Sequence, residues 1–197
     1  MAFSPPRVTG GRLKGRRLFA PATGTRPTTA RLRDSIFNRL DVRSCLDAPV
    51  LDLYAGAGFL GIEALSHGAP GVDFVERDRA ACDVIRRNLA TLEISAGARV
   101  LCLPAERAIR RLHGPYGLCF VDPPYREDAT AVAEAVVHMG ILAPTALVLW
   151  RHPRSRPAPE ALGTLARRDT RRYGDAVLET YRLVLGDPPP GQDESAP

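Results

Sequence analysis

Cysteine and histidine are scarce in this chain of 197 residues, and neither is spaced as in a metal site. The four cysteines (Cys45, Cys82, Cys102 and Cys119) lie far apart without a Cys-x-x-Cys pair, and the four histidines are equally scattered. Cys102 and Cys119 fall in apolar stretches, where a free thiol behaves as a small hydrophobic group. We therefore expect buried thiols, with neither a disulfide framework nor a bound metal.

Long apolar segments are also absent from the sequence. No stretch approaches the roughly 20 apolar residues that span a bilayer, and the basic, glycine- and proline-rich start lacks the apolar core of a signal peptide. Hydrophobic residues make up 45% of the chain and charged residues 25%, as in ordinary globular proteins. These features predict a cytoplasmic protein built around one main domain, and we expect a monomer.

Lysine is nearly missing, since Lys14 is the only one, and arginine supplies most of the positive charge. Residues 1–43 contain ten basic and two acidic residues, a net charge of +8, whereas the whole chain carries +5. A second group of arginines lies towards the C-terminus: Arg151, Arg154, Arg156, Arg167, Arg168, Arg171 and Arg172. Segregated positive charge of this kind favours a nucleic-acid partner.

Residues 1–45 are predicted to form a small basic extension made of a hairpin and a helix. A Gly10-Gly11 turn between short extended pieces indicates the hairpin. The helix should begin within Pro27-Thr28-Thr29, with a threonine as its N-cap, and run to about Arg43. The apolar residues at every fourth position from Leu32 to Leu40 would form its buried face, with the arginines of the helix largely kept off it.

Residues 46–185 alternate between strand and helix patterns. Strands are expected over 50–54, 72–75, 100–103, 118–121 and 146–150, and helices over 60–67, 79–92, 106–112 and 128–139. This alternation predicts an α/β, Rossmann-like fold with a mostly parallel sheet covered on both faces. Segments 165–173 and 176–185 flank a Gly-Asp turn and predict an antiparallel C-terminal hairpin, which brings the sheet to seven strands. The proline-rich tail, 186–197, is expected to be disordered.

A glycine-rich loop follows the first of these strands and opens a helix. Gly56, Gly58 and Gly61 permit a tight turn and a close approach of the backbone to a nucleotide-like ligand. Glu76 ends the second strand, where its carboxylate can accept both ribose hydroxyls. The glycine spacing alone also fits a nicotinamide cofactor. Asp52 favours S-adenosylmethionine, because it can anchor the methionine portion, whereas a pyrophosphate requires a free helix N-terminus.

Asp122-Pro123-Pro124-Tyr125 follows the fourth strand and predicts a site for the amino group of a base. Two prolines fix the backbone and remove two amide donors. The Asp122 carboxylate and the Pro123 carbonyl can then each accept one N–H, which aims the nitrogen lone pair at an activated methyl group. Tyr125 offers a face on which an extruded base can stack, worth ~1–3 kcal/mol. We assign Asp122, Pro123 and Tyr125 as catalytic, without a metal.

Several segments together match one known family. They are Arg26-Pro27-Thr28-Thr29 with the arginines and Ile36-Phe37-Asn38 that follow, residues 50–58, residues 120–125 and Tyr173-Gly174-Asp175. Over about residues 7–185 the chain resembles the RsmD-type 16S ribosomal RNA guanine-N2 methyltransferases. The resemblance implies a class I methyltransferase fold, S-adenosylmethionine as donor, and guanine 966 of 16S rRNA in assembled small subunits as the target.

The resemblance, together with the reasoning above, assigns two sets of contacts. The predicted cofactor-binding residues are Asp52, Tyr54, Gly56, Gly58, Glu76, Ala105, Glu106 and Asp122. The predicted RNA-binding residues are Arg7, Arg12, Lys14, Arg16, Arg17, Arg26, Thr28, Arg31 and Arg33.

Three positions depart from the family pattern. Pro104 stands where related enzymes often have an Asp or Asn that contacts the adenine amino group, so that contact would fall to Ala105 or Glu106. Arg151 replaces a common Glu near the expected target pocket, and Ala30 replaces an acid in the N-terminal helix.

Other interpretations stay open. The Asp-Pro-Pro-Tyr arrangement also suits adenine-N6 or cytosine-N4 in DNA or another RNA, although the chain lacks an obvious sequence-reading domain. A nicotinamide-dependent oxidoreductase would account for the glycine loop and leave Asp122 to Tyr125 unexplained. A non-enzymatic RNA-binding or assembly role is compatible with the basic surface.

Overall fold

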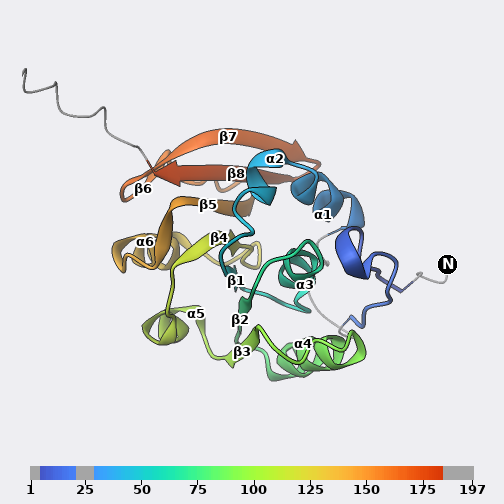
Figure 1. Cartoon of the computed structure of the whole chain (residues 1–197). Coiled ribbons are helices and arrows are strands. Elements are labelled where there is room, and N and C mark those ends of the chain that lie inside the picture. The colour runs from blue at the N-terminus through green and yellow to red at the C-terminus, as the bar shows by residue number, and fades with distance from the viewer. Residues whose placement is uncertain (1–4, 21–28, 184–197) are drawn as a thin grey trace, which may run out of the picture.

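The computed structural model of the chain describes residues 5–20 and 29–183 and contains one mixed sheet of eight strands (Figure 1). The strands are β1 (Val50–Leu53), β2 (Val72–Glu76), β3 (Ala98–Cys102), β4 (Tyr116–Val121), β5 (Leu142–Pro153), β6 (Ala161–Leu162), β7 (Leu165–Tyr173) and β8 (Ala176–Leu183). Their order in the sheet is β3-β2-β1-β4-β5-β8-β7-β6. The first five in this order are parallel, and β8 runs antiparallel between β5 and β7.

The predicted α/β fold is confirmed, with one strand more than the seven expected. Each predicted parallel strand overlaps an observed one, and the terminal hairpin turns at Gly174 and Asp175. The additional strand, β6, is two residues long and pairs antiparallel with the start of β7. So short a strand contains no alternation, and the sequence pattern therefore could not separate it from a loop.

Helices cover both faces of the sheet (Figure 1). On one face lie α1 (Ala30–Phe37), α3 (Phe59–Ser66) and α4 (Arg79–Thr91), with the short α2 (Leu40–Arg43) following α1. On the other face lie α5 (Ala105–Ala108) and α6 (Thr130–His138). Turns of 3₁₀ helix occur at Gly11–Leu13 and Ile109–Arg111. None of the described helices is long and apolar enough to cross a membrane.

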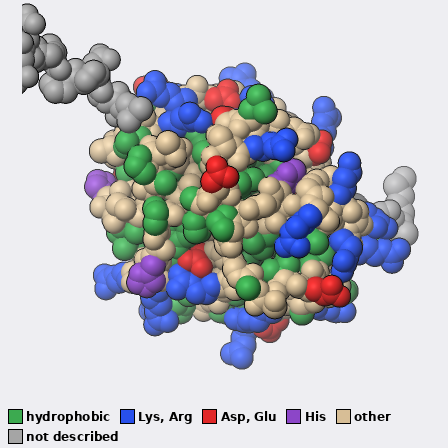
Figure 2. All heavy atoms as spheres, in the orientation of Figure 1, with side chains coloured by type: hydrophobic (Ala, Val, Ile, Leu, Met, Phe, Trp, Pro, Cys, Tyr) green, Lys and Arg blue, Asp and Glu red, His purple; other side chains and the backbone are tan. Residues whose placement is uncertain are grey.

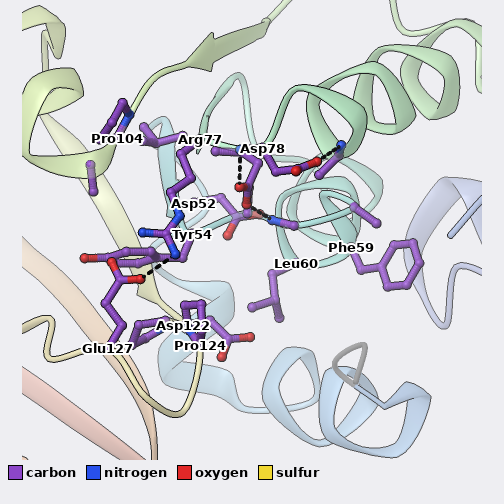
Figure 3. A pocket seen from close by; sticks show the side chains of 18 of the residues that line it. Asp52, Tyr54, Phe59, Leu60, Arg77, Asp78, Pro104, Asp122, Pro124 and Glu127 are labelled. Carbon is purple, nitrogen blue, oxygen red and sulfur yellow. Dashed lines mark hydrogen bonds and ion pairs between the residues drawn. The ribbon is translucent and has the colours of Figure 1, made fainter. Parts of the chain in front are cut away.

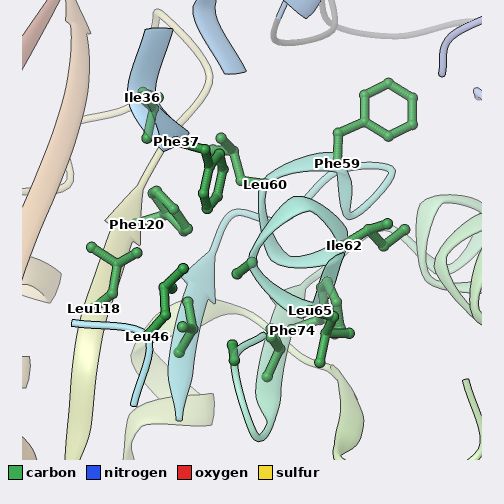
Figure 4. Packing of buried hydrophobic residues seen from close by; sticks show 14 of the residues in the cluster. Ile36, Phe37, Leu46, Phe59, Leu60, Ile62, Leu65, Phe74, Leu118 and Phe120 are labelled. Carbon is green, nitrogen blue, oxygen red and sulfur yellow. The ribbon is translucent and has the colours of Figure 1, made fainter. Parts of the chain in front are cut away.

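The sheet separates two hydrophobic clusters. On the α3 side, Phe120 of β4 packs against Phe37 of α1, with ring centroids 5.9 Å apart (Figure 4). On the opposite side, alternate residues such as Val121 and Trp150 pack with α5 and α6. Because both faces of the sheet are buried, β1 and β4 are apolar at nearly every position. Asp52 is the charged exception, and a buried carboxyl group of this kind usually has a specific role.

The N-terminal helix is shorter than predicted. It begins after Thr29, whose hydroxyl accepts a backbone amide of the first turn at 3.3 Å, and ends at Phe37. Arg39 then adopts an extended conformation, and its Nη1 donates to the Thr180 hydroxyl at 3.0 Å. The chain resumes as α2 at Leu40, which is 83% exposed. The prediction of a buried Leu40 and an exposed Arg39 is wrong, because the break at Arg39 exchanges their environments.

Residues 7–17 form the expected antiparallel loop, closed by a bridge between Arg7 and Arg17. The loop turns through a 3₁₀ segment, in which Gly11 has φ +70° and lies so close to the Ser66 carbonyl that no side chain would fit. The amide of Leu13 donates to the Ser66 hydroxyl at 2.9 Å. The segment is therefore packed onto α3 and shares its core.

Glu63 of α3 is the buried anchor of this packing. One of its oxygens accepts from the Thr9 amide at 2.7 Å, and the other accepts from the Gly10 amide at 3.3 Å. Arg33 of α1 donates to the same carboxylate at 3.1 Å and to the Arg7 carbonyl at 2.8 Å. Arg33 and Glu63 are both almost fully buried, so one ion pair joins α1, α3 and the N-terminal segment.

Replacing Arg33 should destabilise the fold strongly. Arg33→Met leaves the Glu63 carboxylate buried without its cation, which costs about 3–5 kcal/mol of unfolding free energy. Urea unfolding measures this, with Arg31→Met on the exposed side of the same helix as a control expected to stay within about 0.5 kcal/mol of the unmodified protein. Equal stability of the two variants would contradict the anchoring role of the pair.

Candidate functional site

A cavity of about 980 Å³ opens at the carboxyl ends of β1, β2 and β4. It lies where the strand order reverses between β1 and β4, the position at which open parallel sheets bind ligands. Its walls include four groups of residues predicted from the sequence (Figure 3). These are the β1 end and glycine loop (Asp52, Tyr54, Gly56), the β2 end (Glu76), the β3 end (Ala105, Glu106) and the β4 end (Asp122, Pro123, Tyr125).

The glycine loop has the conformation that its sequence predicts. Gly56 and Gly58 have φ values of +55° and +78°, in the left-handed region that favours glycine. Gly58 is the N-cap of α3. At Gly61 a Cβ atom would lie 2.3 Å from the Phe74 ring, so this glycine allows α3 to approach β2 closely.

Glu76 holds two loops together at the mouth of the cavity. Its Oε2 accepts from the Gly56 amide and its Oε1 from the Asp78 amide, both at 2.8 Å. The carboxylate thus joins the β1–α3 loop to the β2–α4 loop. Each carboxylate oxygen has further acceptor capacity, so Glu76 can still receive hydroxyl donors from a ligand.

Asp52 is a buried carboxyl group that faces the cavity from β1 (Figure 3). Its Oδ2 accepts from the Gly61 amide at 2.9 Å, whereas Oδ1 has no hydrogen-bond partner among the described residues. Burial, opposed by the Gly61 hydrogen bond and supported by the charges of Asp122 and Glu76, raises the pKa of Asp52 to about 8. A cationic donor from a ligand would satisfy Oδ1.

Tyr54 stands directly after β1 with φ +60°, a conformation that is rare for a residue with a large side chain. Its hydroxyl is buried without a hydrogen-bond partner in the described part of the chain. Beside it, Arg77 pairs with Glu127 at 3.1 Å, which links the β2 end to the loop after β4 (Figure 3). Tyr54 therefore presents a second polar atom for a ligand.

The β4 end brings the predicted base-binding residues into the same cavity. Asp122 follows Val121 and lies on the same face of the sheet as Asp52, with which it interacts electrostatically. Pro123 and Tyr125 also line the cavity, and Tyr125 is half-exposed. Arg151 of β5 donates from Nε to Oδ1 of Asp122. One continuous space therefore connects Asp52 with the Asp-Pro-Pro-Tyr motif.

The β3 side of the cavity is mostly apolar. Leu103 and Pro104 line it together with Ala105 and Glu106, and Pro104 is the N-cap of the single-turn helix α5. Such a wall suits the face of an aromatic ring. Glu106 places one carboxylate at this end.

Among the described residues of the cavity wall, acidic residues outnumber basic ones. The acids are Asp52, Glu76, Asp78, Glu106, Asp122 and Glu127, and the bases are Arg77, Arg126 and Arg151. The excess of negative charge favours a positively charged ligand. Among residues 5–20 and 29–183, no group of His, Cys, Asp or Glu side chains is placed to hold a metal ion.

The predicted RNA-binding residues separate into three groups. Arg7, Arg12, Lys14, Arg16, Arg17 and Arg31 are exposed. Figure 2 shows basic side chains gathered on the side of the molecule where the N-terminal segment lies in Figure 1. Arg33 is 1% exposed and bonded to Glu63, so the structure does not place it at a surface that meets RNA. Arg26 and Thr28 lie outside the described residues.

Several cavity residues were not predicted from the sequence. Arg77 and Asp78 come directly after β2, and the rule that ligands bind at the carboxyl ends of parallel strands would have indicated them. Glu127 and Ala20 reach the cavity from loops without regular periodicity, so no local pattern marked them. Arg151 departs from the family pattern in the sequence, which does not predict its contact with Asp122.

Comparison with known proteins agrees with the fold. A protein described as "Putative rRNA methyltransferase YlbH" of Bacillus subtilis is 38% identical over 183 residues, covering 89% of this chain and 98% of that protein. "Ribosomal RNA small subunit methyltransferase D" of Escherichia coli K12 is 34% identical over 189 residues, covering 86% and 93%. The solved structure titled "Putative methyltransferase yhhF" from Escherichia coli superposes with a TM-score of 0.81 at 34% identity, covering 90% and 97%.

The fold is therefore that of a class I methyltransferase. A family model described as "Conserved hypothetical protein 95" matches residues 6–182. The chain belongs to this family, as the extent of the match and the similarity to the ribosomal RNA small subunit methyltransferases D show.

The raised pKa of Asp52 predicts a pH-dependent stability. The folded state binds a proton more tightly than the unfolded state, so this group stabilises the fold fully below about pH 4 and loses its contribution as pH rises to about 8. Asp52→Asn should remove this contribution. The unfolding free energy should then fall less steeply with rising pH, by up to about 1.4 kcal/mol per pH unit between roughly pH 5 and 7. Urea unfolding across this range tests it, with the exposed Asp47→Asn as a control that keeps the original slope. Identical slopes for all three proteins would refute the assignment.

Proposed function

We propose that this protein transfers the methyl group of S-adenosylmethionine to the exocyclic N2 of a guanine in 16S rRNA of the small ribosomal subunit, guanine 966 by resemblance to the RsmD-type enzymes. The observation that supports this best is one cavity that joins Asp52 and Glu76 to Asp122, Pro123 and Tyr125. Membership of the family and its relatives named as rRNA methyltransferases support the substrate class.

The residues present fit S-adenosylmethionine. The unsatisfied Oδ1 of Asp52 suits the ammonium group of the methionine portion, and Glu76 suits the ribose hydroxyls. Leu103 and Pro104 offer an apolar wall to the adenine, with Ala105 and Glu106 beside them. The cavity is at the upper end of the ~300–1,000 Å³ typical of ligand sites, and its acidic excess suits a cationic cofactor.

The chemistry of the proposed reaction is mainly that of orientation. S-adenosylmethionine supplies a methyl group that is already activated by a positive sulfur. The Asp122 carboxylate accepts one N–H of the base amino group, and the Pro123 carbonyl accepts the other. This draws the nitrogen from its planar, delocalised state and directs its lone pair, while Tyr125 stacks on the base. Asp122 is also the first acceptor for the proton that the nitrogen must lose.

The exposed basic residues of the N-terminal segment supply the RNA contacts in this proposal. Arg12, Lys14 and Arg17 project from a loop that is fixed to α3 by Glu63, so their positions relative to the cavity are set by the fold. Phosphate contacts of this kind position the enzyme without reading sequence. Ala20, at the end of the same segment, reaches the cavity wall.

Two alternatives differ in measurable ways. A nicotinamide oxidoreductase would bind NADH, whereas the proposed enzyme binds S-adenosylhomocysteine, and a titration with each ligand distinguishes them. Methylation of adenine-N6 or cytosine-N4 would leave N6-methyladenosine or N4-methylcytidine in place of N2-methylguanosine.

Removal of the Asp122 carboxylate should abolish methyl transfer. Asp122→Asn cannot accept the amino proton in the same way, and we expect a rate loss of about 100-fold or more with near-normal binding of S-adenosylhomocysteine. The measurement is methyl transfer to small subunits from a strain that lacks the enzyme, followed by digestion to nucleosides. Asp128→Asn, an exposed acid beyond the motif, serves as a control with unchanged activity. An active Asp122→Asn enzyme, or a product other than N2-methylguanosine, would refute the corresponding part of the proposal.

Loss of an exposed arginine should weaken RNA binding and its salt dependence. Arg31→Ala removes one expected phosphate contact, which lowers the slope of log affinity against log salt by about one. Filter binding or anisotropy at several salt concentrations measures it. Arg86→Ala, whose side chain pairs with Asp83 on α4, should keep the original slope. An unchanged slope for Arg31→Ala would exclude that contact.

A further inference from the structure

Arg151 and Asp122 are neighbours because of the register of the parallel strands. Val121 of β4 pairs with Trp150 of β5, so the next residues, Asp122 and Arg151, stand side by side at the strand ends. Side chains alternate along a strand, which places both on the face that also contains Asp52. On its other side β5 pairs with β8, where Leu178 is the partner of Arg151. The backbone of Arg151 is therefore held by β8, one residue beyond the pairing of β5 with β4.

The Arg151 side chain touches two of the residues assigned to the target base. Its Nε donates to Oδ1 of Asp122, and the two side chains are only 16% and 10% exposed. Its Cζ also lies 5.7 Å from the centre of the Tyr125 ring, within cation–π range. Arg151 is among the arginines that the described residues contribute to the cavity wall, and it is bonded to the first residue of the Asp-Pro-Pro-Tyr motif.

We infer that Arg151 is a positioning residue for methyl transfer: its guanidinium, which also lies near the Tyr125 ring, holds the Asp122 carboxylate in the orientation that accepts the base amino group. The inference rests on the proposed function and assigns a role to a residue that departs from the family pattern. A carboxylate has about four acceptor positions, so pairing with Arg151 is compatible with accepting a base N–H.

The electrostatic surroundings explain why a cation is needed at this place. Asp122 shares the cavity with Asp52 from β1 and Glu76 from β2, so three carboxyl groups face one space. Arg151 supplies a counter-charge through a largely buried ion pair with Asp122. Its planar fork also fixes the orientation of the carboxylate, which a lysine does less well.

A direct phosphate contact is the competing role for an arginine in this basic stretch. Arg154 and Arg156 follow in the same sequence and are exposed, so they are suited to that role. A phosphate contact would act on RNA affinity and its salt dependence. A positioning residue would act on the rate of transfer once RNA is bound. The two roles are therefore separable by kinetics.

The test compares Arg151→Gln, Arg151→Lys, Arg86→Gln, Asp122→Asn and the double variant Arg151→Gln/Asp122→Asn in the full-length protein. Thermal unfolding first establishes which variants are folded. Single-turnover methyl transfer to unmethylated small subunits is measured at saturating enzyme and S-adenosylmethionine. S-adenosylhomocysteine affinity and the salt slope of subunit binding are measured alongside.

Arg151→Gln should lower the single-turnover rate about 10- to 100-fold, with cofactor affinity and salt slope unchanged. Arg151→Lys should recover part of the rate, and it replaces the Gln variant in the test if that variant does not fold. Arg86→Gln, on α4 and paired with Asp83, should react normally. The double variant should be no slower than Asp122→Asn alone, because Arg151 acts through Asp122.

Three results would overturn the inference: a normal rate for Arg151→Gln, a loss confined to RNA affinity with a reduced salt slope, or a further independent loss in the double variant. Failure of the proposed function itself is distinguishable, since the unmodified protein would then transfer no methyl group to the subunits. An active wild type and an inactive Asp122→Asn, with a fully active Arg151→Gln, would keep the function and remove only the role of Arg151.

Discussion

Asp52, Glu76 and Asp122 bring three carboxyl groups to the ends of adjacent parallel strands, where the topology of the sheet holds them around one cavity. The cost of burying these carboxyl groups, together with the repulsion between like charges, governs the rest of the site. The three groups are stabilised in different ways. Glu76 accepts hydrogen bonds from two backbone amides, and Asp122 pairs with Arg151. Asp52 instead has its pKa raised to about 8, which favours its neutral form. The carboxyl group that the protein leaves least satisfied is the one best placed to receive a cation from outside.

A second buried carboxylate, Glu63, connects the outer surface to this site. It anchors the basic N-terminal segment and Arg33 to α3, and the same helix begins at Gly58 of the cofactor loop. The surface expected to meet RNA and the loop expected to meet the cofactor are thus attached to one short helix. Arg33 lies in a basic segment and was predicted to contact RNA, but it forms the buried ion pair with Glu63 instead. Its burial shows that a basic residue in a basic segment need not face the partner.

The sequence was sufficient for features that depend on local pattern. Runs of apolar residues indicated the parallel strands, and the glycine spacing and strand-end position indicated Gly56, Glu76 and Asp122. The features that the sequence did not predict depend on contacts between segments that are distant along the chain. The break at Arg39 is set by Thr180, more than a hundred residues away. The same holds for the contact between Arg151 and Asp122, which follows from strand register and not from any motif.

The hydrogen bonds of the glycine loop also bear on which nucleotide-like ligand the cavity accepts. In a dinucleotide site, free amides at the helix N-terminus bind a pyrophosphate. Here the amide of Gly56 is bonded to Glu76 and that of Gly61 to Asp52, so two amides of the Gly-x-Gly-x-x-Gly segment already have carboxyl partners. An incoming pyrophosphate would displace those bonds and meet the acids of the cavity wall. A ligand with a cationic sulfur and an ammonium group meets the same acids as counterions, and it leaves both backbone hydrogen bonds intact.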